Sequence, residues 1–301
     1  VSPTLKHVAA GEVEALRLWD LASGTLVSAW RAGCGAGPVR TVAFTSDGSA
    51  VLACVNNSVV KVDVFGSGAA VVAVEQHAPL STFALSTPMQ HRARKLVTAG
   101  YDHTMSIFVA DDRWFNDNKP QPLDAKGNTQ LSAAGLAVCF SPDSRYLAVG
   151  TASGDVRGYA ALTFKPIAPF TPHRGAVCAL DIGWAGAERQ MLIASGGADL
   201  CIRVHSLLTS ELMFELDGHV EPVTAVAFSS EGLYLASASR DGTIAMWSMI
   251  SGCQLWLFIG HAGPVNTLRF VPSIEERLLS GGDDGSIREW SIKSGKQKRM
   301  W

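Results

Sequence analysis

The stretch that decides the fold is SASRDGTIAMWS, residues 237–248. Its Ser, Asp and Trp could belong to a hydrolase site. However, Asp241-Gly242 separates two runs in which apolar and small polar residues alternate, and an Asp-Gly pair in that setting is a strong β-hairpin signal. Both central residues of the favoured turn have positive φ, so the pair predicts positive φ at Asp241 and at Gly242.

The same hairpin pattern recurs along the whole chain. Close copies are RLLSGGDDGSIREWS (277–291), MLIASGGADLCIRVHS (191–206) and KLVTAGYDHTMSIFV (95–109). Weaker copies are HVAAGEVEALRLWD (7–20), AVLACVNNSVVKVDV (50–64) and YLAVGTASGDVRGYA (146–160). With the opening stretch, these make seven hairpins.

The spacing of the hairpins predicts the fold class. Their second strands end 42 to 51 residues apart, at Trp19, Val62, Phe108, Tyr159, His205, Trp247 and Trp290. A period of about 40–45 residues is typical of propeller blades. Helical repeats of similar period do not fit, because the segments are rich in Val, Ile, Thr and aromatic residues and are interrupted by Gly, Asp and Pro. We therefore expect an all-β, seven-bladed β-propeller of four-stranded antiparallel blades.

Two further strands complete most repeats. An inner strand precedes the hairpin, as in GPVRTVAF (37–44) and EPVTAVAF (221–228), and is apolar on both faces because it would lie between blades and line the channel. An outer strand follows, as in CQLWLF and KQKRMW. The fourth outer strand, FKPIAPF (164–170), contains two prolines, which only an edge strand tolerates.

The repeats predict one domain, residues 1–301. The expected blades are approximately 1–30 (partial), 37–77, 78–123, 131–170, 174–216, 220–258 and 262–301. The polar stretch 110–130 is expected to be an insertion that replaces or follows the third outer strand. Its Trp114-Phe115 pair is a candidate partner anchor, although packing back onto the blade is equally open.

The first blade begins at its second strand, so its inner strand is missing from this chain. An open strand edge there is a liability that closed propellers avoid. We expect residues preceding Val1 in the intact protein, or a partner segment, to supply that strand.

These features resemble the WD40-repeat β-propeller family. The resemblance rests on Gly218-His219, Gly260-His261, Trp19-Asp20 with its degenerate copy Val62-Asp63, FSPDSRYLAVG (140–150) and the Asp-Gly turns. It implies a structural tetrad of His219, Ser237 or Ser239, Asp241 and Trp247 in the sixth blade, and of His261, Ser280, Asp284 and Trp290 in the seventh. Ser237 and Ser239 share one side of a strand, so the choice between them stays open. Most other blades lack the Trp, and His205, at that position, is interpreted as a packed residue.

A catalytic interpretation of these residues is disfavoured. A catalytic site occurs once, whereas this spacing recurs in different blades, and no G-x-S-x-G elbow is present. The glycine-rich GCGAG (33–37) is not followed by the Lys-Ser/Thr of a phosphate loop. No enzyme activity, cofactor or metal is therefore expected.

The net charge, the apolar runs and the cysteines restrict the classes of partner and the compartment that the sequence is compatible with. Lys and Arg total 25 against 27 acidic residues, so the chain has no general affinity for nucleic acid or an anionic membrane. No apolar run approaches the roughly 18 residues that indicate a membrane-spanning helix. The six cysteines form no C-x-x-C pair and are interpreted as reduced, which predicts an intracellular protein, cytoplasmic or nuclear.

The sequence favours a non-catalytic scaffold that binds other proteins through the narrow face of the propeller. The candidate partner-binding residues lie at the inner strands and beside the hairpin turns: Arg40, Ser81, Leu136, Cys178, Thr224 and Asn266, and Tyr101, Arg240 and Asp283. One alternative is a peptide or modified-residue reader that uses Tyr101 and Asp283 at the channel mouth. Another is an RNA-associated subunit that uses Arg92, Arg94 and Lys95, although a nucleic-acid partner is not favoured.

Overall fold

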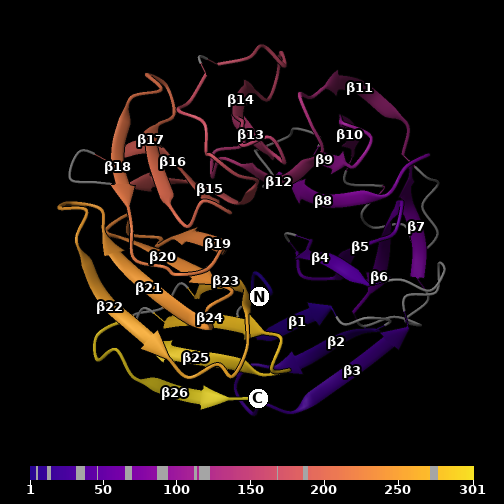
Figure 1. Cartoon of the computed structure of the whole chain (residues 1–301). Helices are drawn as coiled ribbons and strands as arrows, with labels where there is room; N and C mark the ends of the chain where they lie inside the picture. Colours follow the sequence, from indigo (N-terminus) through magenta and orange to yellow (C-terminus); the bar gives the residue numbers. More distant parts are fainter. Residues whose placement is uncertain are drawn as a thin grey trace. The chain divides into compact units, whose positions relative to one another are not determined.

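The protein is all-β in the part of the chain that the structure describes. The structure is a computed structural model and describes residues 1–4, 6–11, 15–31, 38–45, 47–64, 70–86, 94–111, 114, 123–167, 169–185, 189–271 and 277–301. The chain divides into two compact units, Val1–Val138 and Cys139–Trp301. The described strands form seven antiparallel sheets, the blades of a β-propeller (Figure 1).

Unit 1 contains the first three sheets, each a meander of strands adjacent in sequence. The first has three strands: β1 (His7–Gly11), β2 (Ala15–Asp20) and β3 (Leu26–Arg31). The second comprises β4 (Val39–Phe44), β5 (Ala50–Val55), β6 (Ser58–Asp63) and β7 (Ala70–Glu75). The third comprises β8 (Leu80–Leu85), β9 (Arg94–Gly100), β10 (Thr104–Ala110) and β11 (Ala125–Gln130).

The boundary between the units falls inside β12 (Gly135–Phe140), which forms the fourth sheet with β13 (Tyr146–Thr151) and β14 (Val156–Ala160). Unit 2 then adds three four-stranded sheets. They are β15 (Val177–Ala185), β16 (Gln190–Gly197), β17 (Ile202–Ser206) and β18 (Leu212–Leu216); β19 (Val223–Phe228), β20 (Tyr234–Ser239), β21 (Thr243–Ser248) and β22 (Gln254–Ile259); and β23 (Val265–Val271), β24 (Arg277–Gly282), β25 (Ile287–Ser291) and β26 (Gln297–Met300).

The first sheet lacks a strand at the inner position among the described residues. In the second, fourth, fifth and sixth sheets the second strand packs against the first strand of the following sheet, as β5 does against β8 and β16 against β19, and β1 packs against β4 in the same way. A Cβ added at Gly11 of β1 would lie 2.4 Å from Val39 of β4, and one added at Gly196 of β16 would lie 2.5 Å from Val223 of β19. β1 is therefore a second strand.

Three expectations about elements were wrong in detail. The outer strand of the third sheet is β11, which lies inside the stretch expected to be an insertion; its sequence, AKGNTQ, is too polar to stand out as a strand. The fourth outer strand is only a bridge between Tyr159 and Pro166, because proline has no N–H to donate to a ladder. At the Asp-Gly turns only Gly242 and Gly285 have positive φ, because each loop is one residue longer than the two-residue turn: the Gly242 N–H donates to the Ser239 carbonyl and the Gly285 N–H to the Gly282 carbonyl, so only the Gly is left-handed.

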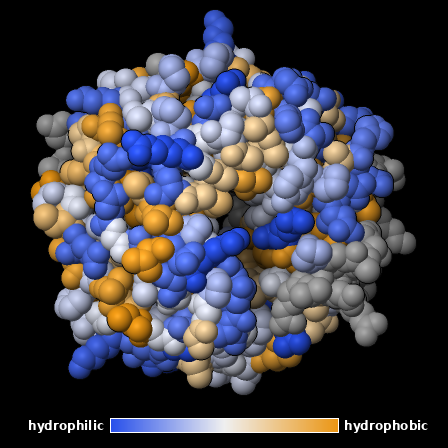
Figure 2. All heavy atoms as spheres, in the orientation of Figure 1, coloured by the Kyte–Doolittle hydropathy of each residue, from blue (hydrophilic) through white to orange (hydrophobic). Residues whose placement is uncertain are grey.

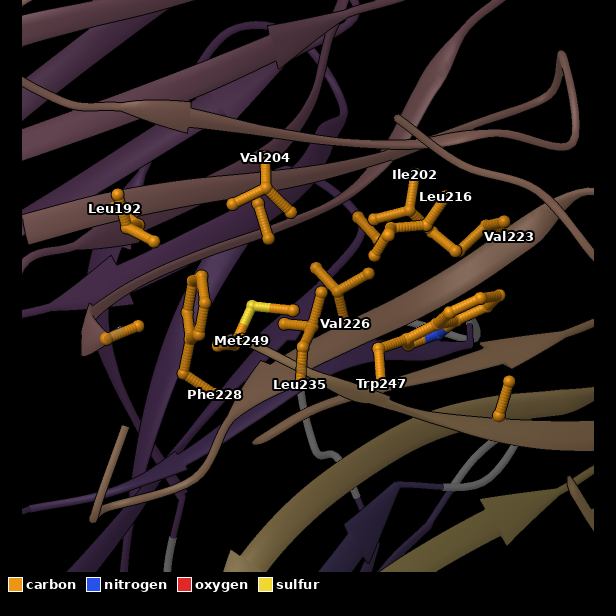
Figure 3. Packing of buried hydrophobic residues seen from close by; sticks show 14 residues of the cluster. Leu192, Ile202, Val204, Leu216, Val223, Val226, Phe228, Leu235, Trp247 and Met249 are labelled. Atoms are coloured by element: carbon orange, nitrogen blue, oxygen red, sulfur yellow. The ribbon is translucent and has the colours of Figure 1, made fainter. Parts of the chain in front are cut away.

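Apolar layers between neighbouring sheets hold each unit together. Between the fifth and sixth sheets, Leu192 and Val204 belong to one buried cluster with Leu235, Trp247 and Met249 (Figure 3). The alternating pattern of each strand places one set of side chains toward each neighbouring sheet. Burial of a large apolar side chain in such a layer contributes about 1.5–3 kcal/mol.

Candidate interaction surface

A chain of hydrogen bonds joins four side chains of the sixth sheet. His219 Nδ1 lies 3.1 Å from Asp241 Oδ2, and His219 Nε2 lies 2.8 Å from Ser237 Oγ. The indole N–H of Trp247 donates to the same Ser237 Oγ at 2.9 Å. Ser239 does not belong to this chain; its hydroxyl donates to the Glu221 carbonyl at 2.9 Å.

The seventh sheet repeats this arrangement. His261 Nδ1 lies 3.0 Å from Asp284, and its Nε2 lies 2.8 Å from Ser280 Oγ, which also accepts the Trp290 indole N–H at 2.8 Å. In both sheets the tetrad joins the loop before the inner strand to the turn between the second and third strands. It therefore holds in place the turns that carry the exposed Arg240 and Asp283.

The fifth sheet contains a third set that the sequence interpretation missed. His173 lies 2.8 Å from both Asp199 Oδ1 and Ser195 Oγ, while His205 occupies the position of the Trp and accepts the Thr171 N–H at 3.3 Å. Pro172 stands where the other two sets have Gly, which concealed the motif. The spacing from Ser195 to Asp199 was the available signal, because it matches that from Ser237 to Asp241.

Burial controls the ionisation of these sets. It lowers the pKa of His219 and of His173, although the neighbouring Asp of each acts in the opposite direction. Burial alone would raise the pKa of Asp199, but hydrogen bonds from Arg203 and His173 hold it at about 2. In the fifth and sixth sheets, the set therefore pairs a neutral imidazole with an ionised carboxylate near neutral pH.

The Ser–His–Asp connectivity matches that of a catalytic triad, but the surroundings do not. Ser237 is fully buried, and its oxygen already accepts an indole N–H. A nucleophile must reach a substrate and an oxyanion hole, which this position does not permit. These side chains join strands.

His205 makes stability depend on pH. Its burial lowers its pKa to about 4, with smaller contributions from His173 and Arg203. Between pH 6.5 and about 4 the unfolded chain binds a proton that the folded chain does not, so stability falls as pH falls through this window, by about 2 kcal/mol. Urea unfolding at about pH 7 and pH 4.5 should show a smaller loss for His205→Phe than for the unsubstituted protein. An equal loss in both proteins would contradict this assignment.

The candidate surface residues of the inner strands share a backbone feature. The pairing register of β4, β8, β15, β19 and β23 shifts by one residue near the start of the strand. A β-bulge of this kind redirects the side chain of the extra residue. The five residues at these shifts are predicted partner-binding residues: Arg40, Ser81, Cys178, Thr224 and Asn266.

The turn residues of the candidate surface also share one geometry. The backbone N–H groups of Tyr101, Arg240 and Asp283 each donate to the carbonyl of the proline before the inner strand of the same sheet, at 3.1, 3.0 and 2.8 Å. In the third, sixth and seventh sheets, the bulge residue and the turn residue therefore lie at the same end of the strands. We call these two sets of residues the bulge-and-turn surface of each unit.

Several of these side chains interact with each other. In unit 1, Arg40 Nη1 donates to Tyr101 Oη at 3.2 Å, and its guanidinium lies 5.5 Å from the centre of the Tyr101 ring. In unit 2, Asn266 Nδ2 donates to Asp283 Oδ1 at 2.5 Å. Burial raises the pKa of the Cys178 thiol, and the positive charge of Arg240 reduces this increase.

Other bulge residues tie sheets together. Ser81 Oγ donates to the Ala99 carbonyl at 2.8 Å and to the Gly135 carbonyl of the following sheet. Thr224 Oγ1 donates to Ala238 and Val265 in the same pattern. Ser81 and Thr224 therefore have a structural role at this surface.

The remaining candidates have different positions. Leu136 is half-buried at the start of β12. Trp114 packs against the buried cluster of the second and third sheets, so it is not a free anchor, and Phe115 lies outside the described residues. Of the RNA-binding candidates, Arg94 is buried and Arg92 lies outside the described residues. Residues 33–37 also lie outside them.

The described residues show neither a metal site nor a membrane span. They contain no group of three or more His, Cys, Asp or Glu side chains placed to bind a metal ion. They also contain no helix that is long and apolar enough to cross a membrane. The five described cysteines are free.

Antiparallel four-stranded sheets joined by inner-strand packing, with a His–Ser–Asp–Trp tetrad, define a β-propeller of the WD type. The model of the family "WD domain, G-beta repeat" matches residues 132–159, 210–248 and 252–291. These three segments are WD40 repeats, in a chain whose described strands form a seven-bladed β-propeller. Members of this family generally mediate protein–protein interaction and are generally non-catalytic scaffolds.

Similar proteins agree with this assignment. The chain is 41% identical over 112 residues (36% of the chain, 23% of the relative) to WD repeat, SAM and U-box domain-containing protein 1 of Danio rerio. It is 34% identical over 107 residues (35% and 33%) to the Target of rapamycin complex subunit wat1 of Schizosaccharomyces pombe, and 31% identical over 171 residues (54% and 35%) to the B-type cell cycle switch protein ccs52A of Medicago truncatula. The chain thus spans between 23% and 35% of the length of these relatives.

One solved structure shows the same fold along almost the whole chain. The crystal structure of the computationally designed Ika8 protein superposes with a TM-score of 0.70 and 23% sequence identity, covering 98% of this chain and 84% of that one.

Proposed function

We propose that this protein is a non-catalytic scaffold within a multiprotein assembly and that it grips partner proteins through its bulge-and-turn surfaces. The observation that carries the proposal is the contrast between two kinds of repeated position. The buried tetrad positions keep the same His, Ser and Asp in three sheets, whereas the bulge positions keep their backbone geometry but differ in side chain, with Arg40, Cys178 and Asn266 at those not used to join sheets. Positions that repeat in backbone and vary in chemistry are suited to binding different partners.

The chemistry of each surface favours protein partners. Arg and Tyr are enriched among residues that dominate interface energetics, and Arg40 and Tyr101 hold each other in place before binding. Arg240 and Asp283 in unit 2 are both exposed and carry opposite charges. A surface of mixed charge fits a protein better than it fits a polyanion.

The free cysteines support an intracellular location, in the cytoplasm or nucleus.

The reader alternative receives less support from this geometry. An aromatic cage for a cationic residue needs an open ring face, and the ring of Tyr101 already faces the Arg40 guanidinium. Asp283 belongs to the other unit. The scaffold is therefore the function that the structure supports best.

Two pairs of substitutions test this function. Arg40→Ala with Tyr101→Ala, and separately Arg240→Ala with Asp283→Ala, should each remove at least one protein captured by the intact protein from cell extract. The melting temperature should change by less than about 2 °C, because exposed side chains contribute little to stability.

The matched control lies at the opposite end of the strands. Arg145→Ala with Leu162→Ala alters two exposed turn side chains there and should leave every captured partner in place. Retention of all partners by both test pairs would refute the proposed surfaces.

A further inference from the structure

The outer strand of the sixth sheet differs in chemistry from the other outer strands of unit 2. β22 has the sequence QLWLFI, and no charged residue or proline occurs from Met249 to Gly260. By contrast, β18 contains Glu215, β26 contains Lys298 and Arg299, and the fourth sheet has Pro166 at this position. Charged residues and prolines on edge strands prevent pairing with other chains. β22 has no such protection.

β22 also presents an open and apolar edge. It pairs with β21 on one side, and no described strand pairs with its other side. Leu255, Trp256, Leu257 and Ile259 are 44%, 40%, 46% and 73% exposed. Figure 2 shows hydrophobic side chains at the lower left, in the region where Figure 1 draws β22. An exposed apolar edge strand of this kind is a template for another strand.

We propose that β22 is a homodimerisation edge, which pairs antiparallel with β22 of a second copy of this chain. In the register centred on Leu257, each Leu257 lies opposite the other, Trp256 lies opposite Phe258, and Leu255 lies opposite Ile259. Each of these cross-strand pairs joins two apolar side chains, and such pairs are favourable. This interface is distinct from the bulge-and-turn surfaces and does not depend on their function.

The absence of charged residues along β22 favours a second copy of this chain over a foreign strand that carries charges. Self-pairing of β22 creates no like-charge contact, whereas a charged residue in another strand would lose water against Leu257 or Trp256 without gaining a counter-charge. A two-fold contact uses the same edge in both copies and is therefore closed. One strand pair buries less than the roughly 1,200 Å² of a stable interface, so the dimer is weak and concentration-dependent.

Sedimentation of the intact protein across the micromolar range tests the surface. The unsubstituted protein should shift from monomer to dimer, and Leu257→Lys with Ile259→Lys should weaken dimerisation at least about tenfold. Ile250→Lys is the matched control, because Ile250 is 63% exposed on the same sheet but lies outside β22. It should leave the dimer intact, and all variants should keep the melting temperature of the parent.

Cross-linking tests the register. In a background of Cys178→Ser and Cys253→Ser, which removes the two exposed cysteines among the described residues, Leu257→Cys should form a covalent dimer on mild oxidation. Opposed Cβ atoms in antiparallel strands lie about 4.5–5.5 Å apart. Ile259→Cys alone should not cross-link, since its partner is Leu255. A protein that stays monomeric throughout, a dimer that the lysines leave unchanged, or cross-linking through Ile259→Cys instead would each overturn the proposal.

Discussion

Replacing Trp290 with alanine is expected to lower the free energy of unfolding by about 4 kcal/mol, the largest effect of any single substitution considered. Trp290 is 2% exposed, packs against Phe258 at a ring-centre distance of 5.4 Å, and donates its indole N–H to Ser280. The alanine variant would leave a cavity between the sixth and seventh sheets and remove a donor from the tetrad. Urea unfolding measures the loss.

Trp290→Phe separates the two contributions. It retains most of the apolar volume but lacks the N–H, so it should cost only about 1–2 kcal/mol. Ser280→Ala combined with Trp290→Phe should cost less than the sum of the single losses, because both substitutions break the same hydrogen bond. Strict additivity would show that the hydrogen bond adds nothing to stability.

The second large effect is expected at Gly154, in the turn between β13 and β14. Gly154 has φ +93°, and a Cβ there would lie 2.2 Å from the carbonyl oxygen of His173. Gly154→Ala should therefore cost about 3 kcal/mol, from the unfavourable φ and from displacement of the backbone that carries a tetrad histidine. Thermal and urea unfolding both report this loss.

Gly285 provides the matched control for this effect. It also has positive φ, +73°, but a Cβ there would meet no atom within 4 Å. Gly285→Ala should therefore cost only about 1 kcal/mol, the contribution of φ alone. Equal losses at Gly154 and Gly285 would mean that the contact with His173 does not matter.

The repeat period and strand alternation in the sequence predict the fold class and the three-stranded first sheet, while the Gly-His, Trp-Asp and Asp-Gly motifs carry the resemblance to WD40 repeats. These features can be read locally, because each hairpin pairs residues that are close in sequence. The outer strands are harder to predict, since they contribute one apolar face or none. AKGNTQ is a strand only because β10 offers it an edge, while FKPIAPF has a strand-like composition but lacks the N–H groups that a ladder needs.

Prediction of the site residues is limited by contacts and register that only the three-dimensional structure shows. The resemblance to WD40 repeats implies Ser237 or Ser239, which share strand parity, and only the structure shows that Ser237 accepts the Trp247 indole N–H. The sequence does not reveal the register shift that places Arg40 at a bulge. Nor does it show that Trp114 packs against the blade, because an aromatic residue in a polar loop looks the same in both arrangements.

The central claim is that the buried tetrads hold the sheets together while the bulge-and-turn surfaces bind partners. Quantitative capture of partners at low temperature, on Ser237→Ala and on Arg40→Ala with Tyr101→Ala, tests it most directly. We expect Ser237→Ala to melt at a lower temperature but to retain the full set of partners, and the surface pair to keep its melting temperature but lose at least one. The reverse result, in which partners are lost with Ser237→Ala and retained by the surface pair, would contradict the account.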